Sequence, residues 1–361
     1  MLIELKESLK RIKNNMNDVK VIIIAGGIGT RLWPVSTQAL PKQFCKLTDP
    51  DKSLLQLTYD RALSITNKEN IFVNTNNQYK NIVIDQLDID EDHILFEPNG
   101  KNTGPIICLI SNHFNKLNPE SVLVYLWADH HYSNTVDSTK YINIAIESSV
   151  QNEVLHTIGI KPSYPHTGLG YIKKSSNLTE HTYIVDEFKE KPNLETAISY
   201  VQSGDYLWNS GTYIAKAKVF INEFSKNDPA TLNIANELDI FNISLDKWNL
   251  FSSISIDYAI TEKADQIIVV EAGLIWSDVG TWSEYENISE IIDNNILVNG
   301  YFKQIDSSNN VIYSDNESVI GLIGITDSII IKNGNKVLIS TKKDISKIGD
   351  LRKMIDEKYL I

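Results

Sequence analysis

A run of small and cationic residues follows the first apolar run of the chain, in the stretch VIIIAGGIGTRLWPVSTQALPKQF from Val21 to Phe44. The three glycines are Gly26, Gly27 and Gly29, and the cations are Arg31 and Lys42. Glycines let the backbone approach a ligand and present its N–H groups, and fixed cations grip phosphate oxygens. The stretch has no acidic residue although the chain has a net charge of -12. It therefore predicts a site for a polyanion such as a triphosphate.

Two familiar phosphate loops do not fit this stretch. A P-loop needs a Lys-Ser/Thr pair after its last glycine, and here Gly29 is followed by Thr30 and Arg31. A dinucleotide-binding loop needs a third glycine at the position of Leu32, whose side chain would obstruct helix–strand packing. The loop is therefore of another kind.

Two aspartates follow apolar stretches elsewhere in the chain. Asp129 lies in WADHH and Asp278 in WSDVG. Carboxylates are hard ligands that suit Mg²⁺, while a lone aspartate at the end of a strand can also cap a turn. His130 and His131 are adjacent, so on an extended chain their side chains point apart, which favours structural roles over a shared metal.

Length and composition favour a globular protein of two domains. The chain has 361 residues, of which 42% are hydrophobic and 22% charged. No apolar run of about 18 residues is present, which predicts no membrane span, and the charged first residues do not resemble a signal peptide. Cys45 and Cys108 are the only cysteines, so we expect a reduced, cytoplasmic setting. The acidic balance argues against nucleic acid as a partner.

Strand and helix patterns alternate from Lys20 to about residue 131, which predicts an α/β domain with a doubly wound, mainly parallel, Rossmann-like sheet. Ligands of such sheets bind at the carboxyl ends of the strands. Ser53 and Gln56 have the spacing of a capping box at a helix start. Residues 154–216 are richer in strands and would form a lid over the strand ends.

The remaining segments complete three expected domains. Residues 1–18 form a helical extension, either packed on its own domain or serving as an oligomerisation arm of a homodimer. Residues 19–285 form the catalytic domain. Residues 286–361 are a row of short β-rich pieces ending in a helix, which predicts a small solenoid (β-helix-like) or a sandwich.

The loop GGIGTRLWPVSTQALPKQF resembles the signature of sugar-1-phosphate nucleotidyltransferases, and RLWP with PKQF is similar to their mannose-1-phosphate guanylyltransferase branch. Seven further motifs match this family in order: EPNGKNTGPI (97–106), WADHH (127–131), TGLGYI (167–172), FKEKPN (188–193), WNSGTY (208–213), SIDYAITEK (255–263) and WSDVGTW (276–282). The resemblance covers about residues 20–285 and continues weakly beyond. One departure is Trp127, where the family commonly has proline.

The resemblance implies attack by mannose 1-phosphate on the α-phosphorus of GTP, with diphosphate leaving in line and Mg²⁺ assisting. It makes Arg31, Lys42 and Lys191 the catalytic cations and Asp129 and Asp278 the metal ligands. The implied nucleotide contacts are Gly26, Gly27, Gly29, Thr30, Asn102 and Thr103. The implied sugar contacts are Gly168, Gly170, Glu190 and Asn209.

Two alternatives remain open from the sequence. The first keeps the mechanism but uses another hexose 1-phosphate or another nucleotide, such as UTP or dTTP, because a few pocket contacts decide this selectivity. The second is a non-catalytic regulatory homologue, although none of the expected catalytic residues is missing. We expect the short form of the family, because no His/Glu cluster typical of a fused isomerase domain follows residue 290.

Overall fold

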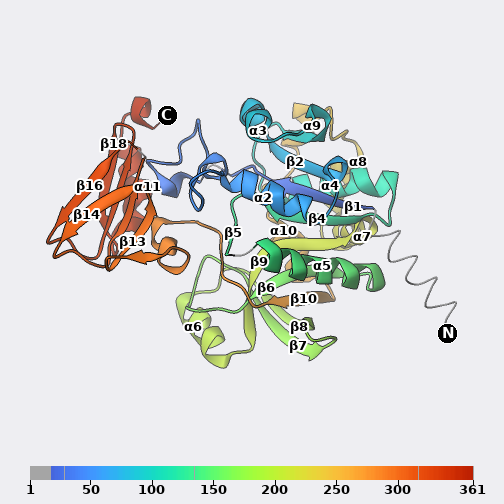
Figure 1. Ribbon diagram of the computed structural model, residues 1–361. Helices are drawn as coiled ribbons and strands as arrows, with labels where there is room; N and C mark the ends of the chain where they lie inside the picture. The colour runs from blue at the N-terminus through green and yellow to red at the C-terminus, as the bar shows by residue number, and fades with distance from the viewer. Residues whose placement is uncertain (1–17, 28, 134, 316, 361) are drawn as a thin grey trace. The chain divides into compact units, whose positions relative to one another are not determined.

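A computed structural model describes residues 18–27, 29–133, 135–315 and 317–360 (Figure 1). The chain folds into two compact units. Of the described residues, those within 1–26, 59–127 and 134–274 form the first unit, and those within 27–58, 128–133 and 275–361 form the second. The helix expected over residues 1–18 lies outside the described residues except for Asp18. The domain boundary expected at residue 285 stays a prediction.

A nine-stranded sheet forms the centre of the first unit, in the order β3-β2-β1-β4-β9-β6-β10-β8-β7. Its strands are β1 (Val19–Ile24), β2 (Ile71–Asn76), β3 (Ile94–Glu97), β4 (Val122–Trp127), β6 (Leu155–Ile160), β7 (Tyr171–Asn177), β8 (Thr182–Lys189), β9 (Tyr206–Lys216) and β10 (Ile267–Ala272). The strands from β3 to β4 are all parallel, as the alternating sequence pattern predicts.

The other half of this sheet is mixed, unlike the mainly parallel sheet that the sequence suggests. β9 lies antiparallel between β4 and β6, β10 is parallel to β6, and β8 is antiparallel to β10 and to β7. Strands β7 to β9 come from the strand-rich segment 154–216. A short turn joins β7 to β8, and such turns can connect only antiparallel neighbours.

Helices cover both faces of the sheet, as expected for a doubly wound fold. One core cluster combines Ile22, Ile24 and Tyr125 with residues of α4, α7 and α8. Val21 and Ile23, which point to the opposite face, are also fully buried. The helices of this part of the chain are α2 (Leu54–Leu63), α3 (Lys80–Gln86), α4 (Thr103–Leu117), α5 (Thr135–Gln151), α6 (Leu194–Ser203), α7 (Ala217–Asn227), α8 (Pro229–Asn236), α9 (Leu245–Asn249) and α10 (Ile256–Ala259).

Trp127 takes a defined place at the end of β4. It pairs with Ile24 of β1, and its indole Nε1 donates a hydrogen bond to the carbonyl of Gly211 at 2.7 Å. Gly211 has φ 74°, and a Cβ there would lie 2.5 Å from that Nε1. Trp127 is therefore part of strand β4, and its indole hydrogen bond links this strand to the WNSG segment.

Short parallel strands build most of the C-terminal part of the second unit. One sheet has the order β12-β13-β15-β17-β18, in which β13, β15 and β17 are parallel, and the parallel pair β14-β16 forms another. These strands are β12 (Ile291–Ile292), β13 (Asn295–Asn299), β14 (Tyr301–Ile305), β15 (Val311–Ser314), β16 (Val319–Ile323), β17 (Ser328–Asn333) and β18 (Lys336–Thr341), followed by α11 (Ile348–Met354). Strands that alternate between two parallel sheets match the β-helix-like expectation rather than a sandwich.

The phosphate-loop residues belong to the same core as this C-terminal region. Leu32, Trp33 and Val35 share a buried cluster with Val311 and Ile331. Two hydrogen bonds reinforce the packing: one runs from the indole Nε1 of Trp282 to the carbonyl of Trp33 at 3.2 Å. The other joins Asn333 Nδ2 to the carbonyl of Pro34 at 3.0 Å.

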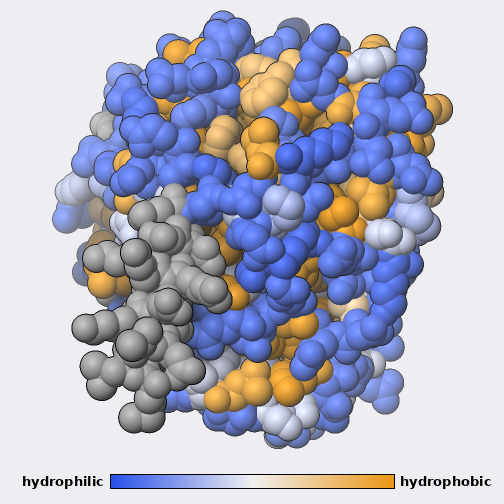
Figure 2. All heavy atoms as spheres, turned by 90° about the vertical axis from the view of Figure 1, so that its right-hand side faces the viewer, coloured by the Kyte–Doolittle hydropathy of each residue, from blue (hydrophilic) through white to orange (hydrophobic). Residues whose placement is uncertain are grey.

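The face of the molecule in Figure 2 is mostly hydrophilic, with hydrophobic residues gathered in small groups. Among the described residues, no helix is long and apolar enough to cross a membrane.

Candidate active site

Gly29 shapes the loop that follows β1. It has φ 63°, a left-handed conformation that favours glycine, and a Cβ there would lie 2.7 Å from the Cβ of Lys42. A 3-10 turn over Thr30–Leu32 then buries Leu32 and leaves Arg31 exposed. Within the described part of the chain, Arg31 makes no ion pair. Its guanidinium is therefore available to a ligand.

Lys42 is buried and joins three segments of the second unit. Its ammonium lies 3.0 Å from Oδ2 of Asp129 and donates to the carbonyls of Asp278 at 2.7 Å and Val279 at 3.4 Å. An ammonium has three donors, so these contacts account for all of them. The expected phosphate cation thus contacts the carboxylate of one expected metal ligand, Asp129, and the backbone carbonyl of the other, Asp278.

Two short strands bring the aspartate segments together. β5 (His131–Tyr132) pairs antiparallel with β11 (Trp276–Ser277), so that His131 lies opposite Ser277. The ring of His130 packs edge-on against Trp276, with 5.1 Å between the ring centroids. His130 therefore packs against Trp276, and His131 takes part in strand pairing. Such structural roles are expected because adjacent side chains on an extended chain point apart.

The turn after Asp278 is strained. Val279 has φ 46°, which is a genuine outlier for a β-branched residue, and such strain concentrates at functional sites. Glu284 stabilises the turn, because its Oε2 accepts from the hydroxyl of Ser277 at 2.7 Å and from the N–H of Gly280 at 2.8 Å. This conformation turns the carbonyls of Asp278 and Val279 toward Lys42.

The donor set around Lys42 fits Mg²⁺ better than a transition metal. The described residues contain no cluster of three or more His, Cys, Asp or Glu side chains arranged to hold a metal. Mg²⁺ is usually held by one or two protein carboxylates and completes its shell with waters and substrate phosphates. Asp129 and Asp278 would supply two such carboxylates, and their role as metal ligands stays a prediction.

A second group of predicted residues lies in the first unit, at the end of β8. The ammonium of Lys191 donates to Oε1 of Glu190 at 2.6 Å, and Lys191 has φ 47° although it is not glycine. Glu190 is buried, whereas about half of the Lys191 side chain is exposed. Burial raises the pKa of Glu190, and the Asp257 carboxylate raises it further. A strained, half-exposed cation beside a buried carboxylate suits the recognition of a phosphate and a neighbouring hydroxyl.

Asn209 adjoins this pair, but its amide is already engaged. Its Oδ1 accepts from the hydroxyl of Thr157 at 2.7 Å and from the N–H of Gly211 at 3.1 Å. Its Nδ2 donates to the hydroxyl of Tyr213 at 3.0 Å and to Asp257 at 3.2 Å. A direct bond from this amide to a sugar would therefore replace an existing one, and the expected sugar contact stays a prediction.

The two glycines of TGLGY have different surroundings. A Cβ on Gly170 would lie 2.6 Å from Oε2 of Glu190, so only glycine leaves room for that carboxylate. Gly168 donates its N–H to Nδ1 of His166 at 2.9 Å, and a Cβ there would lie 2.8 Å from the imidazole.

The expected nucleotide contacts near β3 also have structural partners. Asn102 has φ 64° and caps α4 by accepting from the N–H of Thr103 at 2.9 Å, and the Thr103 hydroxyl accepts from the N–H of Ile256 at 2.9 Å. A Cβ on Gly26 would lie 2.6 Å from Oε1 of Glu97. Burial raises the pKa of Glu97 to about 7.

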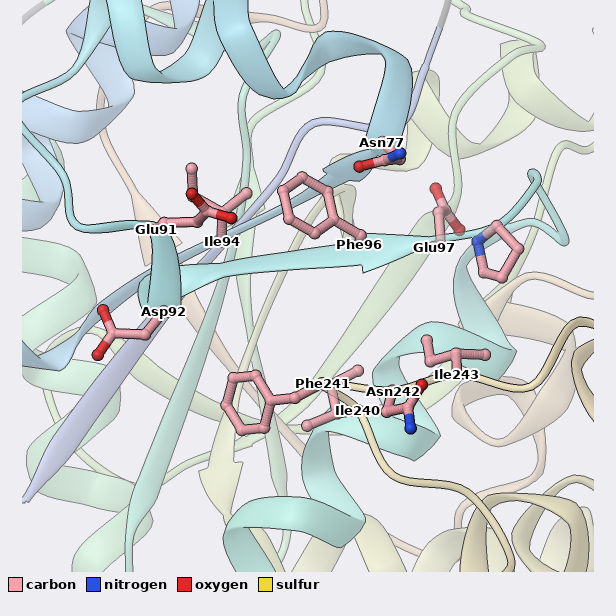
Figure 3. Close-up of a pocket in the computed structure, with 11 residues that line it drawn as sticks. Asn77, Glu91, Asp92, Ile94, Phe96, Glu97, Ile240, Phe241, Asn242 and Ile243 are labelled. Carbon is pink, nitrogen blue, oxygen red and sulfur yellow. The ribbon is translucent and has the colours of Figure 1, made fainter.

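Glu97 also lines a cavity of about 600 Å³ beside β3. Figure 3 shows Glu97 and Asn77 toward one end, Glu91 and Asp92 at the other, and Phe96 between them. Apolar residues Ile240, Phe241 and Ile243 face the strand from the opposite wall.

The structure thus groups most predicted residues into two clusters, one in each unit. Gly29, Lys42, Asp129 and Asp278 lie together in the second unit, and Gly170, Glu190, Lys191 and Asn209 in the first. Three further carboxylates were not singled out from the sequence: the buried Glu97 and Glu284 and the half-buried Asp257. Glu97 and Asp257 lie inside matched motifs, so the signal that could have found them is an acidic residue within a motif that the family shares.

Comparison with known proteins places these motifs in a family. A family model described as Nucleotidyl transferase matches residues 20–295, and one described as MannoseP isomerase/GMP-like beta-helix domain matches residues 303–357. The chain is 34% identical over 94% of its length to mannose-1-phosphate guanylyltransferase 2 of Escherichia coli O157:H7, covering 74% of that protein. It is also 34% identical over 93% of its length to mannose-1-phosphate guanylyltransferase RfbM of Salmonella typhimurium, covering 72% of that protein.

A solved structure supports the fold. The crystal structure of a Thermus thermophilus protein, described as mannose-1-phosphate geranyltransferase, superposes with a TM-score of 0.85 at 24% identity. The match covers 93% of this chain and 99% of that one, so it includes both the α/β layer and the β-helix-like region.

Proposed function

The chain belongs to the nucleotidyl transferase family, and from this premise we propose that it converts GTP and α-D-mannose 1-phosphate into GDP-mannose and diphosphate. The names of the relatives at 34% identity support this substrate pair. An oxygen of the sugar phosphate attacks the α-phosphorus of GTP while diphosphate leaves in line. Such a transfer depends mainly on positioning and charge neutralisation.

The observation that carries the proposal is the cluster in which Lys42 links the glycine loop to Asp129 and Asp278. The loop presents backbone N–H groups and the exposed Arg31 to the triphosphate. Asp129 and Asp278 would hold Mg²⁺, which offsets negative charge on phosphate oxygens when bound. Lys42 joins the two aspartate segments, through the carboxylate of Asp129 and the backbone carbonyl of Asp278.

The cluster around Lys191 suits the sugar phosphate. Its ammonium is half exposed and held by one carboxylate, so a phosphate dianion can compete for it. Glu190 is then left to accept hydrogen bonds from sugar hydroxyls, and Gly170 keeps the space beside its Oε2 free of a side chain. Asn102 and Thr103 remain our proposed contacts to the nucleotide at the start of α4.

A panel assay for diphosphate release tests the proposal. Purified protein with Mg²⁺ should turn over GTP with mannose 1-phosphate faster than UTP or dTTP with glucose 1-phosphate. The opposite preference would overturn the substrate assignment, and no turnover with any pair would favour a regulatory homologue. Asp129→Asn and Asp278→Asn should each raise the Mg²⁺ concentration needed for half-maximal rate, and the double variant should lose little more than either single one.

A further inference from the structure

Asp257 of α10 is a carboxylate to which the reaction as described gives no role. It is an acceptor for two polar side chains of β9: the hydroxyl of Tyr213 donates to its Oδ1, and Nδ2 of Asn209 donates to the same oxygen at 3.2 Å. Tyr213 is fully buried, and its hydroxyl also accepts from Asn209 at 3.0 Å. The three side chains therefore form a closed triangle.

This triangle fixes the orientation of Asn209. The amide has two donors and one oxygen with two acceptor positions, and all of them are used by Tyr213, Asp257, Thr157 and Gly211. With no bond left to make, the side chain has one arrangement. A change at Asp257 would free one donor and allow the amide to rotate.

Contacts lead from Asn209 to the Glu190–Lys191 pair. The N–H of Asn209 donates to the carbonyl of Gly170 at 2.8 Å. A Cβ on Gly170 would lie 2.6 Å from Oε2 of Glu190 and 3.4 Å from the Cβ of Asn209, so Gly170 is packed between them. The position of the Glu190 carboxylate therefore depends on where β9 and its Asn209 are held.

Charge links the same residues. The groups that face Glu190 are the ammonium of Lys191 and the carboxylates of Asp257 and Glu262, whose Oε1 accepts the N–H of Glu190 at 2.9 Å. Lys191 is faced by Glu190, Asp257 and the phenol of Tyr258. Lys191 thus faces both Glu190 and Asp257. A phosphate that draws Lys191 away would leave the Glu190 carboxylate facing Asp257 without this cation.

We propose that Asp257 is a positioning residue of the sugar phosphate subsite. Its hydrogen bonds with Tyr213 and Asn209 hold Asn209 in place and, through Gly170, set the position of the Glu190 carboxylate. The inference rests on the proposed function only in taking Glu190 and Lys191 as the groups that meet the sugar phosphate. It adds a residue that touches neither substrate and acts through its neighbours.

The test compares Asp257→Asn with wild-type protein in steady-state kinetics at several pH values. The KM for the sugar phosphate should rise about 10- to 100-fold, on the order that a misplacement of about 1 Å costs, while the KM for GTP stays within about twofold. Removing the negative charge should also lower the pKa of Glu190, so the acidic limb of the sugar phosphate KM should move to lower pH. A purely structural role would not move that limb.

Two further variants make the outcome decisive. Tyr213→Phe keeps the buried ring and removes the hydroxyl, so it should also raise the KM for the sugar phosphate. A thermal melt of this variant checks that it is folded. Asp265→Asn alters an exposed aspartate that pairs with Lys226 on the surface, and it should match wild type. The proposal is overturned if Asp257→Asn folds and keeps the wild-type KM and pH profile for the sugar phosphate. If Asp257→Asn does not fold, the same result for Tyr213→Phe overturns it.

The test of Asp257 can succeed or fail independently of the substrate assignment. If the panel assay identifies a sugar phosphate other than mannose 1-phosphate, the variants are measured with that compound. A rise in its KM with an unchanged nucleotide KM would still support Asp257, although the substrate assignment had failed.

Discussion

At the scale of single residues, the two lysines of the site differ in how they are held. Lys42 is buried and bonded to three oxygens, whereas Lys191 is half exposed and bonded to one. The first has little freedom to leave its partners, and the second can exchange its carboxylate for a phosphate. This difference separates the expected effects of removing them.

Lys42→Met should destabilise the protein even without substrates. Loss of the ammonium leaves the Asp129 carboxylate and the carbonyls of Asp278 and Val279 without their donor, which costs about 1–3 kcal/mol. Urea denaturation without nucleotide measures this free energy of unfolding. Arg31→Met is the matched control, because Arg31 is exposed: it should change stability by less than about 0.5 kcal/mol while weakening GTP binding. Equal stability of the two variants would contradict the linking role of Lys42.

Lys191→Ala should act on one substrate only. Truncating one partner of a charged hydrogen bond costs about 2–5 kcal/mol when the pair is buried, and exposure of Lys191 places the effect at the lower end. The KM for the sugar phosphate should therefore rise, and GTP affinity measured by calorimetry should stay unchanged. Lys189→Ala, an exposed lysine two residues earlier, is the control. Weaker GTP binding in Lys191→Ala would show that this role is misassigned.

Glu97 should make the stability of the protein pH-dependent. Burial raises its pKa from the ordinary 4.5 to about 7, so the folded protein holds a proton that the unfolded chain releases. The free energy of unfolding should then fall by about 2–3 kcal/mol as pH rises through this window. Glu97→Gln should remove most of that fall. Its free energy of unfolding should therefore exceed that of wild type at pH 8 and equal it near pH 4.5.

Thermal melts across this pH range provide the measurement. Asp92→Asn is the control, since Asp92 is exposed at the other end of the same cavity and should follow wild type. Parallel pH curves for wild type and Glu97→Gln would show that Glu97 does not carry the dependence.

At the scale of secondary structure, the sequence predicts local motifs correctly but does not predict which distant strands pair. The capping box read from Ser53 and Gln56 is confirmed, since each backbone N–H is accepted by the other side chain, at 2.9 and 3.2 Å. Such motifs need only residues that are close in sequence. The antiparallel place of β9 depends on contacts with β4 and β6, far away in the chain, and no local pattern records it.

Trp127 and Gly211 form one such long-range contact, and it can be tested. Gly211→Ala would force a side chain into a left-handed conformation, which costs about 1–2 kcal/mol, and into the indole of Trp127. We expect a lower melting temperature and a higher sugar phosphate KM, because Asn209 lies two residues away. Gly321→Ala is the control: no atom lies within 4 Å of its added Cβ. Unchanged melting of Gly211→Ala would mean that the indole contact is easily released.

At the scale of the whole molecule, the loop and the C-terminal region fold as one compact unit. The change in composition after residue 285 suggests a separate β-rich module, and family motifs identify the loop as part of the catalytic machinery. Neither signal shows that Leu32 and Trp33 share a core with Ile331 and Val311. The sequence thus predicts which residues bind the substrates, while contacts between distant segments determine the core that supports those residues.

This shared core predicts that a change in the β-helix-like region affects nucleotide binding. Ile331→Ala should lower the free energy of unfolding by about 2–5 kcal/mol, because Ile331 is fully buried. The loop that carries Arg31 and Lys42 loses part of its support, so GTP affinity should fall even at temperatures where the variant stays folded. Ile323→Ala is the matched control, since Ile323 of β16 is 75% exposed and should cost less than about 0.5 kcal/mol. Urea denaturation and calorimetric titration with GTP measure the two effects. A destabilised Ile331→Ala that binds GTP as tightly as wild type would show that the C-terminal region stabilises the fold without supporting the phosphate loop.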